Sequence, residues 1–177
     1  MTGPTTEAVR VRSATPVDHA GITAIYNHYV ETSNVTFDIR PFSPVERAPW
    51  FTQFRTAGPH RLFVAVRDGT VLGWASSTRL RPKPAYDRSV ETTVYLDPDA
   101  TGRGLGRLLY DRLLGELAAA GVHRAYAVIA LPNPVSVAFH ERYGYRRVGL
   151  FHEVGYKFER YWDVAWYERP FQSAVLS

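Results

Sequence analysis

The sequence predicts a single α+β domain, arranged as a three-layer fold in which helices flank a mixed central β-sheet. Segments with the alternating pattern of a β-strand occur between segments with the 3.6-residue pattern of an amphipathic helix. The chain has 177 residues, which is enough for one well-buried core. No repeat or low-complexity linker divides it. We therefore expect a domain over residues 8–171, with a loose tail at 1–7 and a short tail at 172–177.

Composition excludes several classes of protein. The net charge is only +4 and no dense basic stripe occurs, so we expect no nucleic-acid partner. The absence of cysteine removes disulfides, thiolate metal sites and cysteine nucleophiles, and we expect no metal. No apolar run is long enough to span a membrane, and the first ten residues lack the apolar region of a signal peptide. We therefore expect a cytoplasmic protein with no membrane partner.

The first half of the chain contains a predicted helix and a predicted β-hairpin. Thr15, Pro16 and Asp18 are residue types preferred at a helix N-cap and in its first turn. Asp68-Gly69 separates two apolar runs, which is the pattern of a hairpin. The predicted elements are a strand at 9–12, the helix with its apolar stripe Ile22, Ile25, Tyr26 and Tyr29, a loop from Thr32 to Pro49, strands at 62–66 and 71–76, and a basic loop from Arg79 to Tyr86.

The second half alternates predicted strands with predicted helices. Residues 90–96 alternate as a strand, with Glu91, Thr93 and Tyr95 on one face. A helix follows the glycine-rich segment and ends at Gly121. Its apolar stripe consists of leucines at positions 105, 108, 109, 113 and 117. The remaining predicted elements are a buried strand at 125–131, a helix from Pro134 to Gly144, and strands at 147–151 and 159–167.

The segment from Thr101 to Arg107 is a glycine loop between a strand and a helix. Such a loop offers free backbone N–H groups and the positive end of a helix dipole to a phosphate group. It is not a P-loop, because Gly106 is followed by Arg107 and Leu108 instead of Lys and Ser or Thr. The dinucleotide fingerprint needs a third glycine at position 107. A helix cap that binds no ligand is the alternative interpretation.

Several ordered blocks make the chain resemble the GNAT superfamily of N-acetyltransferases. The resemblance runs from about Val11 to Phe171 and is greatest to the branch that acetylates phosphinothricin, methionine sulfone and methionine sulfoximine. The glycine loop matches the pyrophosphate pattern Gln/Arg-x-x-Gly-x-Gly/Ala of that superfamily, with Thr101 in place of Gln or Arg. The other matching blocks are Tyr26–Glu31, Ala85-Tyr86, Val90–Tyr95, Ala127–Ile129, Pro132-Asn133, His140-Glu141, Gly155–Lys157 and Trp162-Asp163.

This resemblance implies a GNAT fold and acetyl transfer from acetyl-CoA to the amine of a small amino-acid-like acceptor. It also implies where acetyl-CoA binds. The strand Val94, Tyr95 and Leu96 would hold the pantetheine arm through its backbone. Asn133 matches a residue near that arm, although Pro-Asn-Pro is also a common turn. The pyrophosphate would be held by Gly102, Arg103, Gly104, Leu105, Gly106 and Arg107.

Glu91 and His140 are the predicted catalytic residues. A carboxylate inside a core strand is costly unless it is paired or functional. Glu91 is therefore either a general base or one half of an ion pair with Arg79 or Arg88. Many superfamily members have Tyr at the position of His140, placed to protonate the departing CoA thiolate, and this branch has His. An imidazole can do the same or position the acceptor, but a single helical His is also often structural. With no cysteine available, we expect direct transfer in a ternary complex.

The resemblance places the acceptor near Phe37, Tyr86 and a cationic loop with Arg81 and Lys83. Such a loop suits an acceptor with two anionic groups. Lys83 stands where Arg is common, and Lys cannot form the bidentate pair that Arg forms. A solvated basic surface loop is the alternative. Two functions compete with this one. The enzyme could acetylate another amine, on a protein N-terminus or an antibiotic, or the domain could be a non-catalytic CoA-binding module. We expect a homodimer, with Tyr161, Trp162, Trp166 and Tyr167 either at its interface or in the core.

Overall fold

The structure, a computed structural model, describes residues 8–171. The predicted tails at 1–7 and 172–177 lie outside the described residues. A seven-stranded sheet in the order β1-β2-β3-β4-β5-β7-β6 forms the centre of the domain. Its strands are β1 (Arg10–Ser13), β2 (Leu62–Arg67), β3 (Thr70–Arg79), β4 (Ser89–Leu96), β5 (Arg124–Ala130), β6 (Arg146–Lys157) and β7 (Arg160–Pro170).

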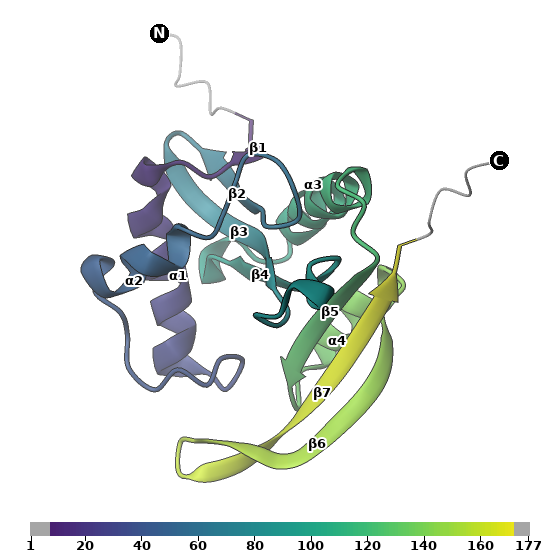
Figure 1. Cartoon of the computed structure of the whole chain (residues 1–177). Coiled ribbons are helices and arrows are strands. Elements are labelled where there is room, and N and C mark those ends of the chain that lie inside the picture. The colour runs from purple at the N-terminus through teal and green to yellow at the C-terminus, as the bar shows by residue number, and fades with distance from the viewer. Residues whose placement is uncertain (1–7, 172–177) are drawn as a thin grey trace, which may run out of the picture.

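Helices cover both faces of this sheet, which confirms the predicted α+β three-layer architecture (Figure 1). On one face α1 (His19–Thr32) and α2 (Pro44–Phe51) pack against apolar residues of β2 and β3. On the other face lie α3 (Leu105–Ala119) and α4 (Pro134–Arg142). Residues of β2 are buried on both faces, which explains its uninterrupted apolar run.

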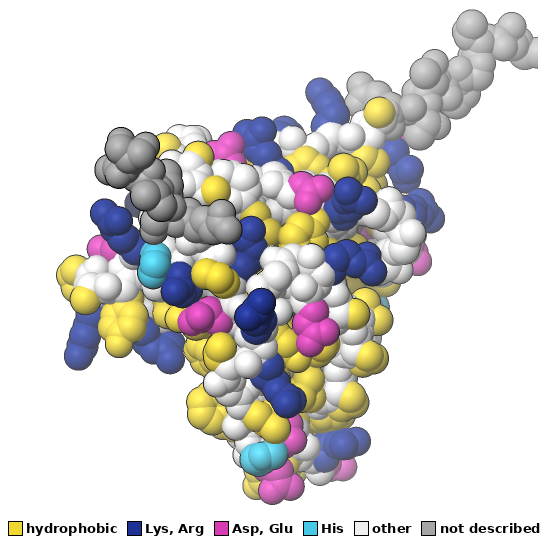
Figure 2. All heavy atoms as spheres, turned by 90° about the vertical axis from the view of Figure 1, so that its right-hand side faces the viewer, with side chains coloured by type: hydrophobic (Ala, Val, Ile, Leu, Met, Phe, Trp, Pro, Cys, Tyr) yellow, Lys and Arg dark blue, Asp and Glu magenta, His cyan; other side chains and the backbone are white. Residues whose placement is uncertain are grey.

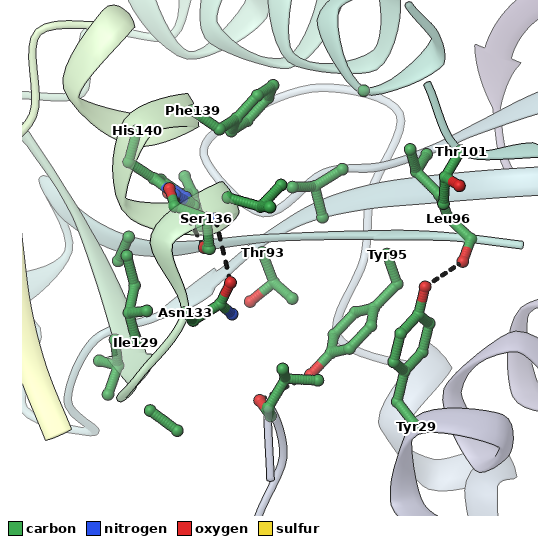
Figure 3. Close-up of a pocket in the computed structure, with 18 residues that line it drawn as sticks. Tyr29, Thr93, Tyr95, Leu96, Thr101, Ile129, Asn133, Ser136, Phe139 and His140 are labelled. Atoms are coloured by element: carbon green, nitrogen blue, oxygen red, sulfur yellow. Dashed lines mark hydrogen bonds between the residues drawn. The ribbon is translucent and has the colours of Figure 1, made fainter. Parts of the chain in front are cut away.

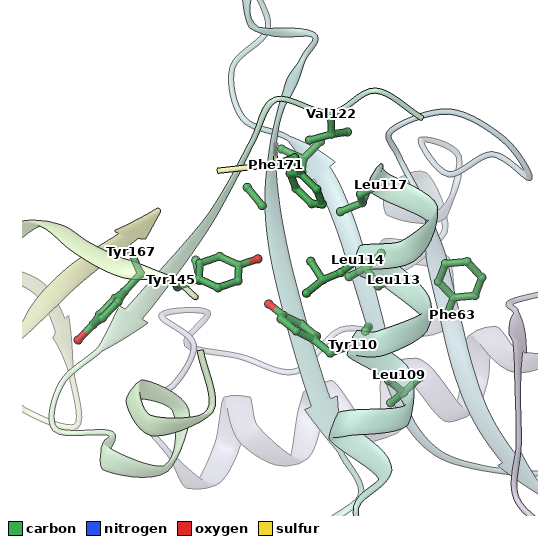
Figure 4. Packing of buried hydrophobic residues seen from close by; sticks show 14 of the residues in the cluster. Phe63, Leu109, Tyr110, Leu113, Leu114, Leu117, Val122, Tyr145, Tyr167 and Phe171 are labelled. Atoms are coloured by element: carbon green, nitrogen blue, oxygen red, sulfur yellow. The ribbon is translucent and has the colours of Figure 1, made fainter. Parts of the chain in front are cut away.

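The main core forms between α3 and the sheet (Figure 4). Leu109, Leu113 and Leu117 of α3 are fully buried there, as their helical spacing predicts. The helix is the crossover that a parallel pair of strands needs, because it joins β4 to β5. Every other strand pair in the sheet is antiparallel.

One predicted loop is wrong, because the segment from Thr32 to Pro49 contains most of α2. Ser43 is the N-cap of this helix, and its Oγ accepts a hydrogen bond of 3.3 Å from the Glu46 N–H. The Glu46 carboxylate in turn accepts from the Ser43 N–H at 2.9 Å. This reciprocal pair is a capping box, and Pro44 occupies the first helical position. The sequence Ser-Pro-Val-Glu therefore carried a helix signal within a polar segment.

The last two strands form a hairpin that is longer than predicted. The strands predicted at 147–151 and 159–167 extend to Arg146–Lys157 and Arg160–Pro170. Phe158 and Glu159 form the turn with φ values of 53° and 58°. Hairpin turns of this hand usually contain Asn and Gly, so the sequence gave no turn signal at this point. The hairpin projects beyond the rest of the sheet as an arm, which we call the β6–β7 arm (Figure 1).

Candidate active site

The sheet opens between β4 and β5. These two strands pair only where Ser89–Glu91 meets Arg124–Tyr126. Beyond that point β4 stays paired with β3, and β5 stays paired with β7. Two cavities lie at the opening, one of 290 Å³ beside α4 and one of 480 Å³ beside α2. We call them the α4-side and α2-side cavities, and both are lined by Val35, Thr93, Tyr95, Val128 and Ala130.

The open edge of β4 forms one wall of the α4-side cavity (Figure 3). The Asp97 N–H donates to the Leu72 carbonyl at 2.9 Å, so it points toward β3. Because backbone groups alternate in direction along a strand, those of Val94 and Leu96 point to the cavity and those of Tyr95 point to β3. The hydroxyl of Tyr29 already donates to the Leu96 carbonyl at 2.7 Å. An extended amide-containing chain would therefore find the N–H and C=O of Val94 and the N–H of Leu96.

The glycine loop borders the same cavity at the start of α3. Gly104 is the N-cap with φ 77°, and no side chain caps the helix. The first intrahelical bond runs from the Leu108 N–H to the Gly104 carbonyl, so the N–H groups of Leu105, Gly106 and Arg107 have no intrahelical acceptor. A Cβ at Gly102 or Gly104 would meet no atom within 4 Å, so the loop faces open space. This geometry fits a pyrophosphate. The Thr101 hydroxyl donates to the Pro98 carbonyl at 3.0 Å.

Asn133 serves as the N-cap of α4 and also lines the α4-side cavity. Its Oδ1 accepts from the Ser136 N–H at 3.1 Å, as a turn or cap residue would. Its Nδ2 has no hydrogen-bond partner within residues 8–171 and remains available to a ligand. Asn133 can therefore serve as a turn or cap residue through Oδ1 and contact the pantetheine arm through Nδ2.

His140 lines the α4-side cavity but is itself almost fully buried, at 4% exposed. Its Nδ1 donates to the Ser136 carbonyl at 2.8 Å, and its Nε2 lies 2.9 Å from the Tyr110 hydroxyl. The Tyr110 hydroxyl also lies 2.9 Å from Thr92 Oγ1. Burial lowers the pKa of His140. Because both ring nitrogens are occupied, the ring presents no free N–H to the cavity.

Glu91 lines the other cavity, on the α2 side of the opening. Burial raises its pKa, and the positive charge of Arg81 opposes this rise. Within the described part of the chain Glu91 forms no ion pair, and Arg79 pairs with Asp87 at 3.9 Å. The predicted alternative of an ion pair with Arg79 or Arg88 is therefore wrong. Glu91 and His140 line different cavities, so the structure does not bring them together.

The predicted acceptor residues divide into two groups. Phe37 lines the α2-side cavity. Arg81, Lys83 and Tyr86 are exposed on the loop between β3 and β4 and line neither cavity. The Arg81 guanidinium lies 5.5 Å from the centre of the Trp166 ring.

Sequence reasoning missed most of the wall of the α2-side cavity, because that wall comes from α1, α2, the loop between them and β3. The capping box at Ser43 would have located α2, but no local pattern shows that these side chains share a cavity with Glu91. The missed lining residues include Tyr26, Asp38, Phe42, Arg47, Trp50 and Trp74.

Residues 22–145 match the model of the acetyltransferase (GNAT) family. The chain belongs to the GNAT family. Its sheet and helices have the GNAT fold, and relatives named as acetyltransferases identify it as an acetyl-CoA-dependent N-acetyltransferase. Within the described residues, no helix of this GNAT enzyme has the length and apolar character needed to cross a membrane.

Relatives of this GNAT enzyme align over almost its whole length. A phosphinothricin N-acetyltransferase of Streptomyces coelicolor is 53% identical, covering 94% of this chain and 99% of the relative. An L-methionine sulfoximine/L-methionine sulfone acetyltransferase of Pseudomonas aeruginosa is 34% identical, covering 87% of this chain and 90% of the relative. A crystal structure of a phosphinothricin acetyltransferase from Sinorhizobium meliloti in complex with acetyl-CoA superposes with a TM-score of 0.88 at 32% identity, covering 96% of this chain and 91% of that one.

Proposed function

We propose that this enzyme transfers the acetyl group of acetyl-CoA to the amine of a small anionic amino-acid-like acceptor. The proposed acceptors are phosphinothricin, methionine sulfone and methionine sulfoximine. The observation that carries it is the meeting of two cavities where β4 leaves β5, with a carboxylate in one and open backbone groups in the other. Relatives that act on these acceptors support it.

In this proposal the two substrates meet across β4. The pantetheine arm lies along Val94 and Leu96, and the pyrophosphate lies at the free N–H groups of residues 102–107. The acceptor enters the α2-side cavity. Thr93 and Tyr95 line both cavities, so the thioester and the amine can meet beside them. The amine then attacks the thioester carbonyl directly. Holding both reactants in line on the enzyme removes the entropic cost of bringing them together from solution.

Glu91 is the proposed general base, acting directly or through a water molecule. An α-ammonium group has a pKa of roughly 8–10 and becomes nucleophilic only after it loses a proton. The raised pKa of the partly buried Glu91 makes this carboxylate a stronger base than one in water. The positive charge of Arg81, on the exposed loop between β3 and β4, acts to lower the pKa of Glu91. Lys83 and Tyr86 would contact an acceptor only where it extends out of the α2-side cavity toward that loop.

His140 is proposed to act through Ser136. The Ser136 Oγ lies 3.3 Å from His140 Nδ1 and lines the α4-side cavity. The hydroxyl can give its proton to the departing thiolate and take a proton from water in the cavity, while the Nδ1–H of the neutral His140 ring orients that hydroxyl. Ser136→Ala should then lower kcat at high pH, where solvent protons are scarce, and should leave the KM for acetyl-CoA within about twofold. An unchanged pH profile would show that protonation does not pass through this pair.

The proposal is tested by thiol release from acetyl-CoA with a panel of amines. The panel contains the three named acceptors, an aminoglycoside and a peptide N-terminus, so that each competing function has its own positive result. Glu91→Gln should lower kcat by roughly 10²- to 10⁴-fold, as loss of a general base does. Unchanged turnover in that variant would exclude Glu91 as the base. Parallel initial-rate plots would exclude a ternary complex.

We also propose that two copies of the chain associate through the β6–β7 arm. Large apolar side chains are exposed along it, and Figure 2 shows apolar side chains gathered over the narrow lower part of that face, which is the arm. Tyr161 is 60% exposed and suits an interface, whereas Tyr167 is 4% exposed and belongs to the core. The other exposed apolar residues of the arm are Val148, Phe151, Val154, Tyr156 and Phe158.

A further inference from the structure

Arg47 is a buried cation that has no carboxylate partner among the residues that the structure describes. It projects from α2 into the α2-side cavity and is 6% exposed. Within residues 8–171 no ion pair includes its guanidinium, and its Nε has no hydrogen-bond partner. A charge removed from water is costly unless an opposite charge or hydrogen bonds compensate for it. Burial therefore outweighs the favourable effects of Tyr26 and Asp38 on this charge and lowers the pKa of Arg47, so its positive charge is only partly compensated.

Aromatic rings hold the guanidinium in this position. Its central carbon lies 3.8 Å from the centre of the Tyr26 ring and 4.5 Å from that of Trp50. Phe42 lies further away, at 5.2 Å. These faces attract a cation but contribute less than a carboxylate would. The planar guanidinium is thus fixed before any ligand arrives, and its fork of N–H donors matches a carboxylate.

The carboxylates that line the cavity do not neutralise Arg47. Glu46 points back to its own helix start and pairs with Arg40 at 2.8 Å. Asp38 accepts a hydrogen bond from the Tyr26 hydroxyl. Asp38 contributes a favourable charge effect to Arg47, yet burial dominates and lowers the pKa of Arg47. Glu91 is the remaining acid in the lining and is the proposed base.

We propose that Arg47 binds the α-carboxylate of the acceptor and so makes this enzyme selective for amino acids over simple amines. The inference rests on the proposed function, because it assigns a residue to the proposed acceptor cavity. An α-amino acid has its carboxylate and its ammonium group on the same carbon atom. With the carboxylate on Arg47, the ammonium group faces the cavity that also contains Glu91, where it loses its proton. Arg47 is then a specificity-determining residue in contact with substrate.

The test compares methionine sulfone with the amine formed by replacing its carboxylate with hydrogen. Arg47→Met should lower kcat/KM for methionine sulfone by roughly 30- to 1,000-fold, mostly through KM, because the buried charge partner is lost. The same variant should leave kcat/KM for the decarboxylated amine within about threefold. Arg47→Lys should fall between, since a point charge lacks the bidentate geometry. Arg40→Met, which removes an exposed arginine from the same segment, is the matched control and should change neither value.

Equal losses with both acceptors in Arg47→Met would overturn the proposal. Thermal unfolding gives a second measurement that does not need turnover. Replacing an unpaired buried cation by an apolar side chain of similar length should preserve or raise Tm, and a fall would indicate a structural role. Methionine sulfone should raise the Tm of the wild-type enzyme and not that of Arg47→Met. If the wild type acetylates none of the panel amines but shows this ligand-dependent difference, the proposed function fails while the carboxylate site stands.

Discussion

Most buried charged side chains of this enzyme have partners that offset the cost of removing the charge from water. Asp18, Arg61 and Lys157 are each at most 5% exposed. Arg61 pairs with Glu116 at 2.9 Å, and Lys157 donates to the carbonyls of Ser33 and Thr36 at 2.8 Å each. Each of these charges therefore has partners within its own chain, as burial requires. Arg47 differs from them, and for this reason we assign it a ligand.

Asp18 allows a prediction about stability and pH. Its carboxylate accepts two hydrogen bonds from Arg12, at 2.7 and 2.9 Å, and one from the Thr15 N–H at 2.7 Å. Burial acts to raise the pKa of Asp18, but these hydrogen bonds outweigh it and the pKa lies below its ordinary value. The stabilisation is therefore complete above the unfolded pKa of about 3.9 and is lost as pH falls through the lower folded pKa.

Asp18→Asn should lower the free energy of unfolding by about 1.5–3 kcal/mol at pH 7. Urea unfolding at pH 7 and at pH 3 measures this difference. The gap between wild type and variant should narrow toward the acidic end, because the wild-type carboxylate then becomes neutral as well. A gap that widened at low pH would contradict the assignment.

Among the elements, the start of α3 combines a left-handed backbone conformation with the proposed pyrophosphate site. Gly104 has φ 77°, a conformation that costs an L-residue roughly 1–2 kcal/mol. Gly104→Ala should therefore lower Tm by a few degrees and raise the KM for acetyl-CoA about tenfold, because the N–H groups of the loop are displaced. Gly121→Ala is the matched control, since Gly121 has φ 71° at the far end of α3. Gly121→Ala should lose similar stability while its KM for acetyl-CoA stays unchanged. Equal KM values for acetyl-CoA in the two variants would show that the loop does not contact the cofactor.

The β6–β7 arm and the loop after α1 are held together beside the α2-side cavity, where we propose that the acceptor binds. Lys157 binds two carbonyls of that loop, and a Cβ added to Gly155 would overlap the Phe37 ring. Gly155→Ala should therefore displace Phe37 and raise the KM for the acceptor, with little change in the KM for acetyl-CoA. Gly149→Ala on the same strand is the control, because its Cβ would meet only Trp166, at 3.9 Å. An unchanged KM for the acceptor in Gly155→Ala would show that Phe37 does not contribute to acceptor binding.

The whole molecule combines a continuous core with one opening in its sheet and one projecting arm. If the arm is a dimer interface, sedimentation should give twice the mass of one chain. The double change Val154→Lys and Tyr161→Lys should then produce monomers, because it places charges at apolar positions of that interface. Val17→Lys, at a residue 84% exposed on another part of the surface, should leave the mass unchanged. A wild-type monomer would exclude the proposal.

Much of the fold and part of the site could be predicted from local sequence patterns. The hairpin at Asp68-Gly69 occurs where predicted, and Thr15 caps a short 3-10 helix, Pro16–Asp18, that leads into α1. The predicted leucines lie on α3 and are buried except Leu108, which is exposed. Their signals depend on residues a few positions apart, within reach of one turn or one strand. The hairpin at Phe158 and Glu159 was not located, because its turn lacks the usual residues. Helix α2 was missed although its capping box was present.

By itself, the sequence determined the order of the strands and of α1, α3 and α4, the glycine loop and the position of Glu91 within a strand, because each follows from short-range backbone and side-chain preferences. Only the tertiary structure decided that β4 separates from β5, that His140 has both ring nitrogens occupied, and that Glu91 shares a cavity with Arg47. These features depend on contacts between residues tens of positions apart. Long-range packing sets the burial and partners of each charge, and these decide whether a polar residue is structural or free to bind a substrate.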